Sequence, residues 1–253
     1  MPKFFVKSDQ IKEDKIVITG EDVNHIKNVL RLSVNDDLQI CDLDTAINYI
    51  CGISKIDNDK IECNIFNQIN SEAESKLHIN VFQGIPKSDK MELIIQKCVE
   101  LGVNEITPVE MKRCIVKIED KSKIKKIERW QKISEVAAKQ CGRDKVPKIN
   151  DVINIKNICN QALEYDILLL AYENEKENTL KNELLSLKNK TNENLKIGVI
   201  IGPEGGLDKE EVEILKENGA KSVTLGKRIL RTETVAFVLS SIIMYELGDL
   251  GGV

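Results

Sequence analysis

Hydrophobic and polar positions alternate over short intervals in the first part of the chain. Runs rich in β-branched residues, separated by polar turns, lie at residues 15–19, 38–43, 47–56 and 60–69. One helical pattern interrupts them at residues 21–30. Short strands at this spacing are typical of an all-β domain. We therefore predict a small β-barrel over residues 1–70.

From Leu77 onward the pattern changes to alternating strands and helices. Residues 70–76 are polar and mark the predicted boundary. Apolar residues then repeat at helical spacing between Met91 and Leu101, and Gly102 stands where a helix C-cap would. Strand-like runs lie at residues 77–82, 106–109, 167–171, 197–201 and 222–225, with amphipathic segments at residues 124–141 and 208–218. This order predicts an α/β domain with a largely parallel sheet over residues 71–253.

The composition favours a soluble protein without disulfides or a metal centre. At 253 residues the chain can hold one large or two modest domains. Its seven cysteines form no Cys-x-x-Cys pair, which argues against disulfides and against metal binding. No segment has the length of a signal-peptide core or of a membrane span. We expect a cytoplasmic protein with no metal and no membrane partner.

Two glycine-bearing loops near the C-terminus are the strongest candidates for a ligand site. The first is Gly202-Pro203-Glu204-Gly205-Gly206, directly after a strand-like run. The second is residues 225–234, which begin Leu225-Gly226. Glycine lets a ligand approach bare backbone and tolerates positive φ. Two such loops at the ends of neighbouring buried strands predict a small-molecule site.

Common motifs for nucleotides and nucleophiles are missing around these loops. The sequence contains no Gly-x-Gly-x-x-Gly, which weakens a dinucleotide fold. Residues 219–227 come nearest to a P-loop, but Arg228 stands where Ser or Thr would hold magnesium. The two histidines, His25 and His78, lie outside the loop region, which argues against a Cys or Ser nucleophile with a histidine base there. The net charge of −4 does not favour binding of a polyanion by charge alone, although 37 basic residues can gather on one face.

The two glycine-bearing loops, in this order, resemble the C-terminal signature of the RsmE family. Members of this family are ribosomal RNA methyltransferases of the SPOUT superfamily. Besides the first glycine loop, the signature takes in Leu225-Gly226 and residues 228–234, Arg-Ile-Leu-Arg-Thr-Glu-Thr. The resemblance continues along the chain at Phe4-Phe5-Val6, His25, Val29-Leu30-Arg31, Gln96-Lys97, residues 100–103, Ala137, Gln140, Arg143, Pro147 and residues 248–250. An ordered set of this length is far more specific than a single Gly-Pro-Glu-Gly-Gly.

The resemblance implies a PUA-like β-barrel domain followed by a SPOUT methyltransferase domain of α/β fold, with a C-terminal trefoil knot. Knots are so rare that physical rules alone would exclude one. The resemblance also implies S-adenosyl-L-methionine as the cofactor. The methyl group would be transferred to N3 of one uridine in the 16S ribosomal RNA of the small subunit. Family members act as homodimers, so we expect a homodimer.

The implied cofactor explains why metal motifs are missing, because its sulfonium group already activates the methyl group. On the resemblance, backbone groups of the two glycine loops and apolar side chains should hold it. The predicted cofactor contacts are Leu169, Ile201, Gly202, Pro203, Glu204, Gly205, Leu225, Gly226, Ile229, Leu230 and Thr234. For Glu204 the alternative is a turn residue without a cofactor contact.

Methylation of uracil N3 also requires a cation and a proton acceptor. N3 bears a proton and lies on the pairing edge, so the base must be unpaired and its anion stabilised. We expect Arg231 to stabilise the negative charge on the uracil oxygens. Glu233 has three candidate roles. It accepts the N3 proton directly or through water, or it holds Arg231 by a salt bridge. Alternatively, it is only an acidic residue at the start of a helix, where its charge interacts favourably with the helix dipole.

RNA contacts are expected from both domains. The candidates for phosphate contacts are Lys3, His25, Arg31, Lys87, Lys97, Gln140 and Arg143. The sequence departs from the family pattern at two positions. Lys3 stands where Arg is usual and lacks its planar bidentate fork. Val235 stands where Ala is usual and would narrow the pocket slightly if this position packs against the cofactor.

The last helix and the reaction target leave alternatives open. Residues 234–247 are apolar nearly all round, which predicts a helix buried on every side, in a knotted dimer interface or in the core of a monomer. The target is alternatively another rRNA or tRNA nucleotide, or the chain is a non-catalytic RNA-binding assembly factor. The whole-chain resemblance argues against another target. The intact glycine loops, with Arg231 and Glu233, argue against a non-catalytic factor.

Overall fold

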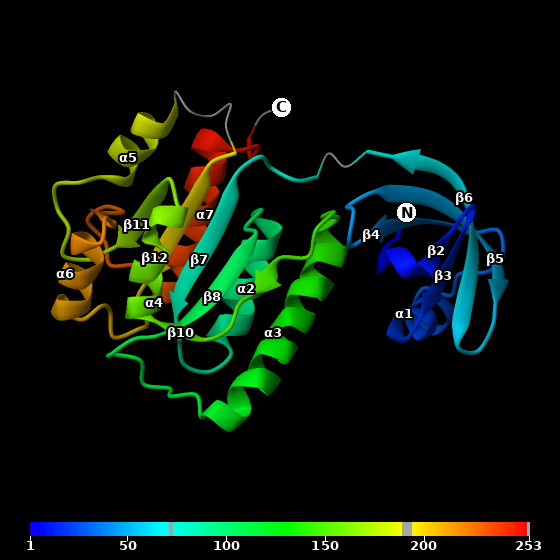
Figure 1. Ribbon diagram of the computed structural model, residues 1–253, viewed down its shortest axis with the longest axis horizontal. Coiled ribbons are helices and arrows are strands. Elements are labelled where there is room, and N and C mark those ends of the chain that lie inside the picture. Colours follow the sequence, from blue (N-terminus) through cyan, green and yellow to red (C-terminus); the bar gives the residue numbers. More distant parts are fainter. Residues whose placement is uncertain (71–72, 189–193, 252–253) are drawn as a thin grey trace. The chain divides into compact units, whose positions relative to one another are not determined.

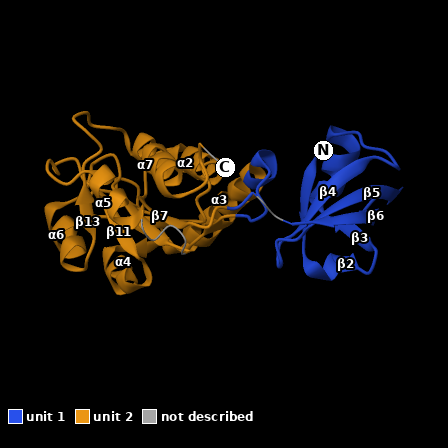
Figure 2. Ribbon diagram, turned by 90° about the horizontal axis from the view of Figure 1, so that it is seen from above, with its two compact units in different colours: residues 1–74, 138–146 blue, residues 75–137, 147–253 orange. Residues whose placement is uncertain are grey.

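The chain, seen in a computed structural model, is described over residues 1–70, 73–188 and 194–251 (Figure 1). It forms two compact units, residues 1–74 with 138–146 and residues 75–137 with 147–253 (Figure 2). The chain therefore passes between the units three times, because the end of one long helix and the loop after it belong to the N-terminal unit. Ser71 and Glu72, at the predicted boundary, lie outside the described residues.

The N-terminal unit is a six-stranded sheet around one core. In order across the sheet its strands are β1 (Lys3–Val6), β4 (Asp37–Asp42), β5 (Asn48–Ile56), β6 (Lys60–Ile69), β3 (Lys15–Thr19) and β2 (Ile11–Lys12). The β1–β4 pair is parallel and the other pairs are antiparallel. The four predicted strands are confirmed to within one residue. The predicted helical pattern is a short helix, α1 (Glu21–Asn24), continued by a π-helical turn at His25–Val29.

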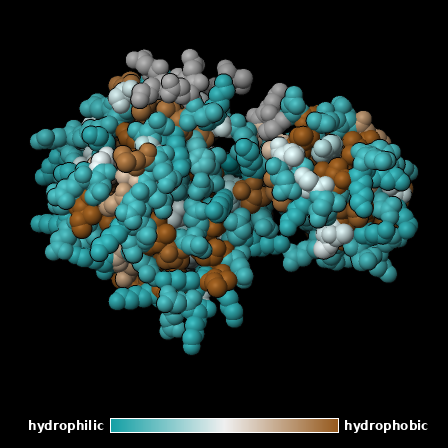
Figure 3. All heavy atoms as spheres, in the orientation of Figure 1, coloured by the Kyte–Doolittle hydropathy of each residue, from teal (hydrophilic) through white to brown (hydrophobic). Residues whose placement is uncertain are grey.

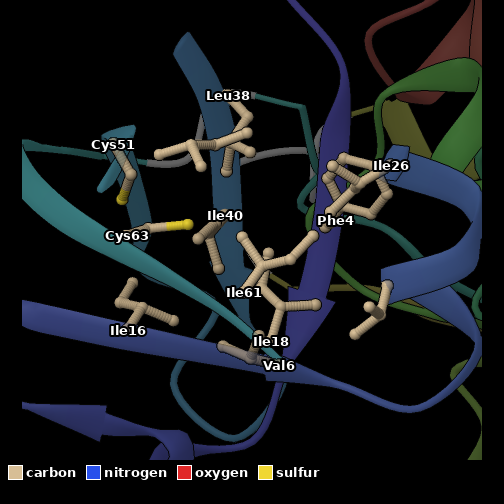
Figure 4. Packing of buried hydrophobic residues seen from close by; sticks show 12 residues of the cluster. Phe4, Val6, Ile16, Ile18, Ile26, Leu38, Ile40, Cys51, Ile61 and Cys63 are labelled. Carbon is tan, nitrogen blue, oxygen red and sulfur yellow. The ribbon is translucent and has the colours of Figure 1, made fainter. Parts of the chain in front are cut away.

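Side chains from most of these strands meet in a single apolar core (Figure 4). Its members are Phe4, Val6, Ile16, Ile18, Val23, Ile26, Leu38, Ile40, Cys51, Ile53, Ile61 and Cys63. Strand β3 shows the two-residue period directly, because Ile16 and Ile18 are buried whereas Lys15 and Thr19 are exposed. Burial raises the pKa of Cys51 and of Cys63 to about 12. Both thiols therefore stay protonated and pack as apolar side chains.

A buried polar cluster joins the loop after the long helix to this unit. Asp144 forms an ion pair with Lys3 and accepts a hydrogen bond from Asn48 Nδ2 at 2.6 Å. The Lys3 and Asp144 side chains are only 6% and 4% exposed. Next to Asp144, Arg143 forms an ion pair with Glu74 at 2.6 Å. These contacts explain why the loop belongs to the N-terminal unit, although it follows a helix that begins in the other.

The C-terminal unit contains the predicted parallel sheet. In order across the sheet its strands are β10 (Ile153–Asn154), β8 (Glu105–Glu110), β7 (His78–Gly84), β12 (Lys196–Ile201), β11 (Ile167–Ala171) and β13 (Lys221–Val223), and β9 (Lys148–Ile149) also pairs with β8. Every pair is parallel. The five predicted strands are confirmed, with ends shifted by at most two residues. Strands β7, β12 and β11 are buried along almost their whole length, as is usual in parallel sheets.

Helices connect or follow these strands. They are α2 (Lys90–Glu100), α3 (Asp120–Cys141), α4 (Ile155–Asn160), α5 (Leu180–Leu187), α6 (Lys209–Glu217) and α7 (Thr232–Leu247). The structure confirms the helices predicted at α2, α3, α6 and α7, and Gly102 has a φ of 86° just after α2. Helices α4 and α5 were not predicted, because they are too short for a clear helical period.

Helix α7 packs against α2 and has one exposed face. Ile242 and Tyr245 are 37% and 65% exposed. The prediction that this helix is buried on every side is therefore wrong for the single chain. On the face seen in Figure 3, hydrophobic patches interrupt a mostly hydrophilic surface. No helix in the described part of the chain is long and apolar enough to cross a membrane.

Glu105, at the start of β8, is held by two polar neighbours. It lies 2.8 Å from His78 Nε2 and accepts a hydrogen bond from Asn150 Nδ2 at 2.7 Å. The His78 contact is the main cause that lowers the pKa of Glu105 to about 2, and burial acts against it. The ionised carboxylate thus links β7, β8 and the segment after β9.

Replacing Glu105 by Gln should destabilise the C-terminal unit in a pH-dependent way. The pKa of Glu105 is about 2 in the folded chain and 4.5 without the fold, so its stabilisation is present above pH 4.5 and is lost as the pH falls toward 2. We expect Glu105→Gln to lower the free energy of unfolding by about 2 kcal/mol at pH 7, and the difference to shrink below pH 4.5. Urea unfolding followed by Trp130 fluorescence measures both. Equal losses in Glu164→Gln, a control at an exposed carboxylate, would contradict this prediction.

Replacing Lys3 by Met should destabilise the N-terminal unit, because it leaves the Asp144 charge buried without its cation. Removing one partner of a buried ion pair typically costs about 3–5 kcal/mol. We expect the backbone amides of β1 and β4 to lose protection accordingly in native-state hydrogen exchange. Lys60→Met is the matched control, at a more exposed pair with Glu62, and should change protection little. Equal protection in both variants would mean that the buried pair does not hold the unit together.

Candidate active site

Four neighbouring strands of the C-terminal unit end level with one another. Backbone pairing places Gln83, Ile201, Ala171 and Val223 in one row across β7, β12, β11 and β13. Because the four strands are parallel, the loops that follow them leave the same edge of the sheet. Open α/β sheets bind their ligands at this edge.

A cavity of about 480 Å³ lies at this edge. It is lined by Lys90, Val235 and residues 171–173, 201–206 and 223–232. Small-molecule pockets usually measure about 300–1,000 Å³, so the size suits a ligand of that class. Both predicted glycine loops contribute to the wall, as does Val235, one of the two departures from the family pattern.

Most residues predicted to contact a cofactor line this cavity. They are Ile201, Gly202, Pro203, Glu204, Gly205, Leu225, Gly226, Ile229 and Leu230. Leu169 and Thr234 do not line it. Leu169 is fully buried within β11, two residues before the strand ends, and Thr234 lies in the first turn of α7. For these two residues a cofactor contact stays a prediction.

Bare backbone forms part of the cavity wall at Gly226. Its φ is 112°, a conformation that other residues rarely adopt. No atom lies within 4 Å of the place that a Cβ would take, so the space beside this backbone is open. Nearby, the Ile229 side chain is 87% exposed. A ligand in the cavity can therefore lie against backbone and cover an apolar side chain.

Arg231 and Glu233 occupy different positions relative to the cavity. Arg231 lines it, and no carboxylate among the described residues forms an ion pair with Arg231. Glu233 does not line the cavity; its Oε2 atom is 3.3 Å from Lys90 Nζ. That oxygen is buried and accepts no hydrogen bond within the described part of the chain. The salt bridge considered between Arg231 and Glu233 is therefore absent there, and Lys90 takes its place.

Lys90 is one of the residues of this site that were not predicted from the sequence. Its ammonium group lies 3.1 Å from Glu204 Oε1, and both side chains line the cavity. The pair with Glu204 raises the pKa of Lys90 most, the pair with Glu233 adds to this, and burial acts against it, so the charge of Lys90 is retained. Burial acts to raise the pKa of Glu204, but hydrogen bonds from its own backbone, from Lys90 and from Lys87 lower it overall. The only sequence signal for Lys90 is its position just after β7, at the edge where the glycine loops meet.

A buried polar link attaches the start of α7 to the sheet. The Thr232 hydroxyl donates to the Gly202 carbonyl at 2.7 Å and accepts a hydrogen bond from Gln83 Nε2 at 2.8 Å. Gln83 and Thr232 are both buried. The link fixes the first turn of α7 beside the glycine loop. Arg231 is the N-cap residue that directly precedes this turn.

The residues predicted to contact RNA lie in both units and differ in exposure. His25, Arg31 and Gln140 are exposed in the N-terminal unit, and Lys87 is exposed in the C-terminal unit. Lys97 is partly exposed and pairs with Glu100 at 2.8 Å. Lys3 and Arg143 are buried in the ion pairs described above. An RNA contact stays a prediction for all seven, and the structure gives Lys3 and Arg143 a structural partner instead of a free charge.

No metal centre accompanies the cavity in the part of the chain that the structure describes. Among residues 1–70, 73–188 and 194–251, no group of three His, Cys, Asp or Glu side chains is placed to hold a metal ion. The polar groups of the cavity are instead two lysines, two arginines, carboxylates, hydroxyl groups and glycine backbone. Such groups can orient a ligand and stabilise charge.

Comparison with known proteins agrees with this arrangement. The sequence pattern of an RNA methyltransferase domain matches residues 73–244, and that of an RNA methyltransferase PUA domain matches residues 18–66. The chain is 34% identical to ribosomal RNA small subunit methyltransferase E of Bacillus subtilis, over 100% of this chain and 99% of the relative. It is also 34% identical to the protein of that name from Mesomycoplasma hyopneumoniae, over 94% of this chain and 97% of the relative.

A solved structure shows the same fold. The crystal structure of a ribosomal RNA small subunit methyltransferase E from Neisseria gonorrhoeae, bound to S-adenosyl methionine, superposes with a TM-score of 0.86 at 29% identity. The match covers 99% of each chain. The N-terminal unit is accordingly PUA-like and the C-terminal unit is an α/β methyltransferase domain. The chain belongs to the family of ribosomal RNA small subunit methyltransferase E.

Proposed function

We propose that this protein transfers a methyl group from S-adenosyl-L-methionine to N3 of one uridine in the 16S ribosomal RNA of the small subunit. The observation that carries this proposal is the cavity between the two glycine loops, in a chain that matches the methyltransferase family over its full length. The Neisseria relative binds S-adenosyl methionine, which supports the same cofactor for this chain.

The residues of the cavity fit such a cofactor. The open space beside Gly226 allows close approach to backbone, and Ile201, Leu225 and Leu230 supply apolar walls. Exposed Ile229 provides further apolar surface that a bound molecule would cover. The sulfonium group supplies an activated methyl group, so the reaction requires neither a metal nor a covalent intermediate on the protein. The task of the protein is therefore to bind, to orient and to stabilise charge.

Arg231 is suited to stabilise the uracil anion. When the N3–H bond breaks, negative charge develops on N3 and on the two neighbouring oxygens. N3 then forms a bond to the methyl carbon while the bond from that carbon to the sulfonium sulfur breaks, and S-adenosyl-L-homocysteine leaves. A guanidinium group can donate to such oxygens in a fixed geometry. Arg231 lines the cavity and no described carboxylate neutralises it, which leaves its charge available to the base.

Glu233 is the proposed proton acceptor, through a bridging water. Its side chain does not line the cavity, so direct contact with N3 is less suitable. Its buried Oε2 accepts no hydrogen bond from the described residues, which leaves an acceptor site for water. The alternative role of Glu233 is a favourable interaction of its charge with the helix dipole, in which it takes no part in the proton transfer.

We further propose that the C-terminal domain is a SPOUT domain with a trefoil knot and that the protein acts in the cytoplasm as a homodimer. The family resemblance and the gathering of residues 201–206 and 223–232 at one edge support the knot. Exposed Ile242 and Tyr245 on α7 support the dimer, because a second chain would cover them. The proposed phosphate contacts remain His25, Arg31, Lys87, Lys97 and Gln140. The proposed domains are residues 1–70 and 71–253.

Nucleoside analysis by mass spectrometry tests the proposed function. Small ribosomal subunits from cells that lack this protein should lack 3-methyluridine, and purified protein with S-adenosyl-L-methionine should restore it. Arg231→Ala should restore it at least about 100-fold more slowly, because the charge on the uracil oxygens loses its cation. Arg129→Ala is the matched control, at an exposed arginine paired with Glu92 outside the cavity. If 3-methyluridine is already present without the protein, the target is wrong.

Gly226→Ala should weaken cofactor binding by about tenfold or more, since a Cβ would occupy the open space beside the backbone. Gly219 provides a matched control, because it has a φ of 93°, nothing within 4 Å of a Cβ position and no place in the cavity wall. Both variants should lose similar stability from strain at positive φ. Calorimetric titration with S-adenosyl-L-methionine measures the affinities. Equal affinities in Gly226→Ala and Gly219→Ala would place the cofactor elsewhere.

A further inference from the structure

Lys90 stands between two carboxylates from different parts of the chain. Its Nζ atom lies 3.1 Å from Glu204 Oε1 and 3.3 Å from Glu233 Oε2. Lys90 is the first residue of α2, Glu204 belongs to the loop after β12, and Glu233 lies in the first turn of α7. The three side chains are between 14% and 28% exposed, so water weakens these ion pairs only in part. One cation thus connects three segments at the edge of the cavity.

The Glu204 loop is also held without Lys90. The Lys87 backbone N–H donates to Glu204 Oε1 at 3.1 Å. Close packing of Gly84 adds to this, because a Cβ on Gly84 would stand 2.7 Å from Pro203 Cδ. The loop after β7 and the glycine loop are therefore interlocked by backbone contacts. Removal of the Lys90 side chain leaves these contacts in place.

The Glu233 carboxylate has no such second support. Its buried Oε2 accepts no hydrogen bond from the residues that the structure describes, and the pair with Lys90 is the one ion pair that its carboxylate forms among them. Glu204 is held by the same ammonium group, and its like charge would repel Glu233 once that group is gone. The other titratable groups that line the cavity are Tyr172, Glu173, Lys227, Arg228 and Arg231. None of the cations among them forms an ion pair with Glu233 within the described residues.

We propose that Lys90 is a positioning residue for methyl transfer. It holds the Glu233 carboxylate, and with it the first turn of α7, against a glycine loop that stays in place on its own. This inference rests on the proposed function, in which Arg231 and Glu233 act from that turn. A small displacement of acting groups is enough to slow an enzyme by orders of magnitude.

Kinetics of Lys90→Gln test the proposal. We expect kcat to fall about tenfold or more while KM for S-adenosyl-L-methionine changes less than about threefold, because the cofactor loop keeps its own contacts. Lys90→Arg should recover most of the rate. A merely structural role would not produce this combination.

Lys123 provides a closely matched control. Its ammonium group also stands between two carboxylates, Asp120 at 2.9 Å and Glu110 at 3.4 Å, and its side chain is 28% exposed, as is that of Lys90. It does not line the cavity. Lys123→Gln should therefore leave kcat unchanged. Equal kinetics in Lys90→Gln and Lys123→Gln would overturn the proposal.

A double variant shows whether Lys90 acts through Glu233. Glu233→Gln alone should lower kcat, and adding Lys90→Gln should then cost less than about twofold more, because the contact is already lost. If the two losses multiply, Lys90 acts independently of Glu233 and the proposal is wrong.

Hydrogen exchange separates this proposal from the proposed function. The Val235 amide donates to the Arg231 carbonyl at 2.9 Å and reports on the first turn of α7. Its exchange rate should be about tenfold higher in Lys90→Gln than in the wild-type protein, and should not change in Lys123→Gln. This readout needs no RNA, so it remains valid if the wild-type protein methylates no uridine, a result that refutes the proposed function alone. Unchanged exchange in Lys90→Gln overturns the positioning role alone.

Discussion

The candidate active site depends on the parallel register of β7, β12, β11 and β13. In a parallel sheet every carboxyl end lies at the same edge, so segments far apart in the sequence meet there. Gln83, Ile201, Ala171 and Val223 stand in one row. A slip of one strand by two residues would move its loop by about 7 Å, which is beyond the reach of a hydrogen bond. The buried aliphatic strands that fix this register therefore also fix the cavity.

The start of α7 is attached to that edge from several sides. The Thr232 hydroxyl is shared between Gln83 and the Gly202 carbonyl in a buried environment, where hydrogen bonds are strong. The Lys90 ion pairs hold the same turn from the side of the cavity. A turn with this support keeps Arg231 beside the cavity while its guanidinium group stays unpaired among the described residues. Rigid support combined with an available charge is what electrostatic stabilisation of an anion requires.

The sequence predicted the fold well where a periodic pattern was long enough. The strands from β3 to β13 that carry apolar runs, and the helices α2, α3, α6 and α7, were found, whereas α4, α5 and the two-residue strands have too few positions for a period. The glycine loops were found by their motifs. Lys90 and Glu173 were missed, because the alternation of strands and helices does not give the order of strands in the sheet. Only that order brings the loops after β7 and β11 beside the glycine loops.

The roles of basic residues were the hardest to predict, because the type of residue does not reveal its partner. Lys3 and Arg143 were both expected at the RNA, yet each is buried with a carboxylate. Lys3 also donates to the Gly142 carbonyl at 3.1 Å, so its ammonium group has two partners within the N-terminal unit. A compact ammonium group satisfies Asp144 and a carbonyl oxygen without the planar fork of arginine. The departure from the family pattern at Lys3 is therefore compatible with a structural role, and the RNA contacts rest more firmly on exposed His25 and Arg31.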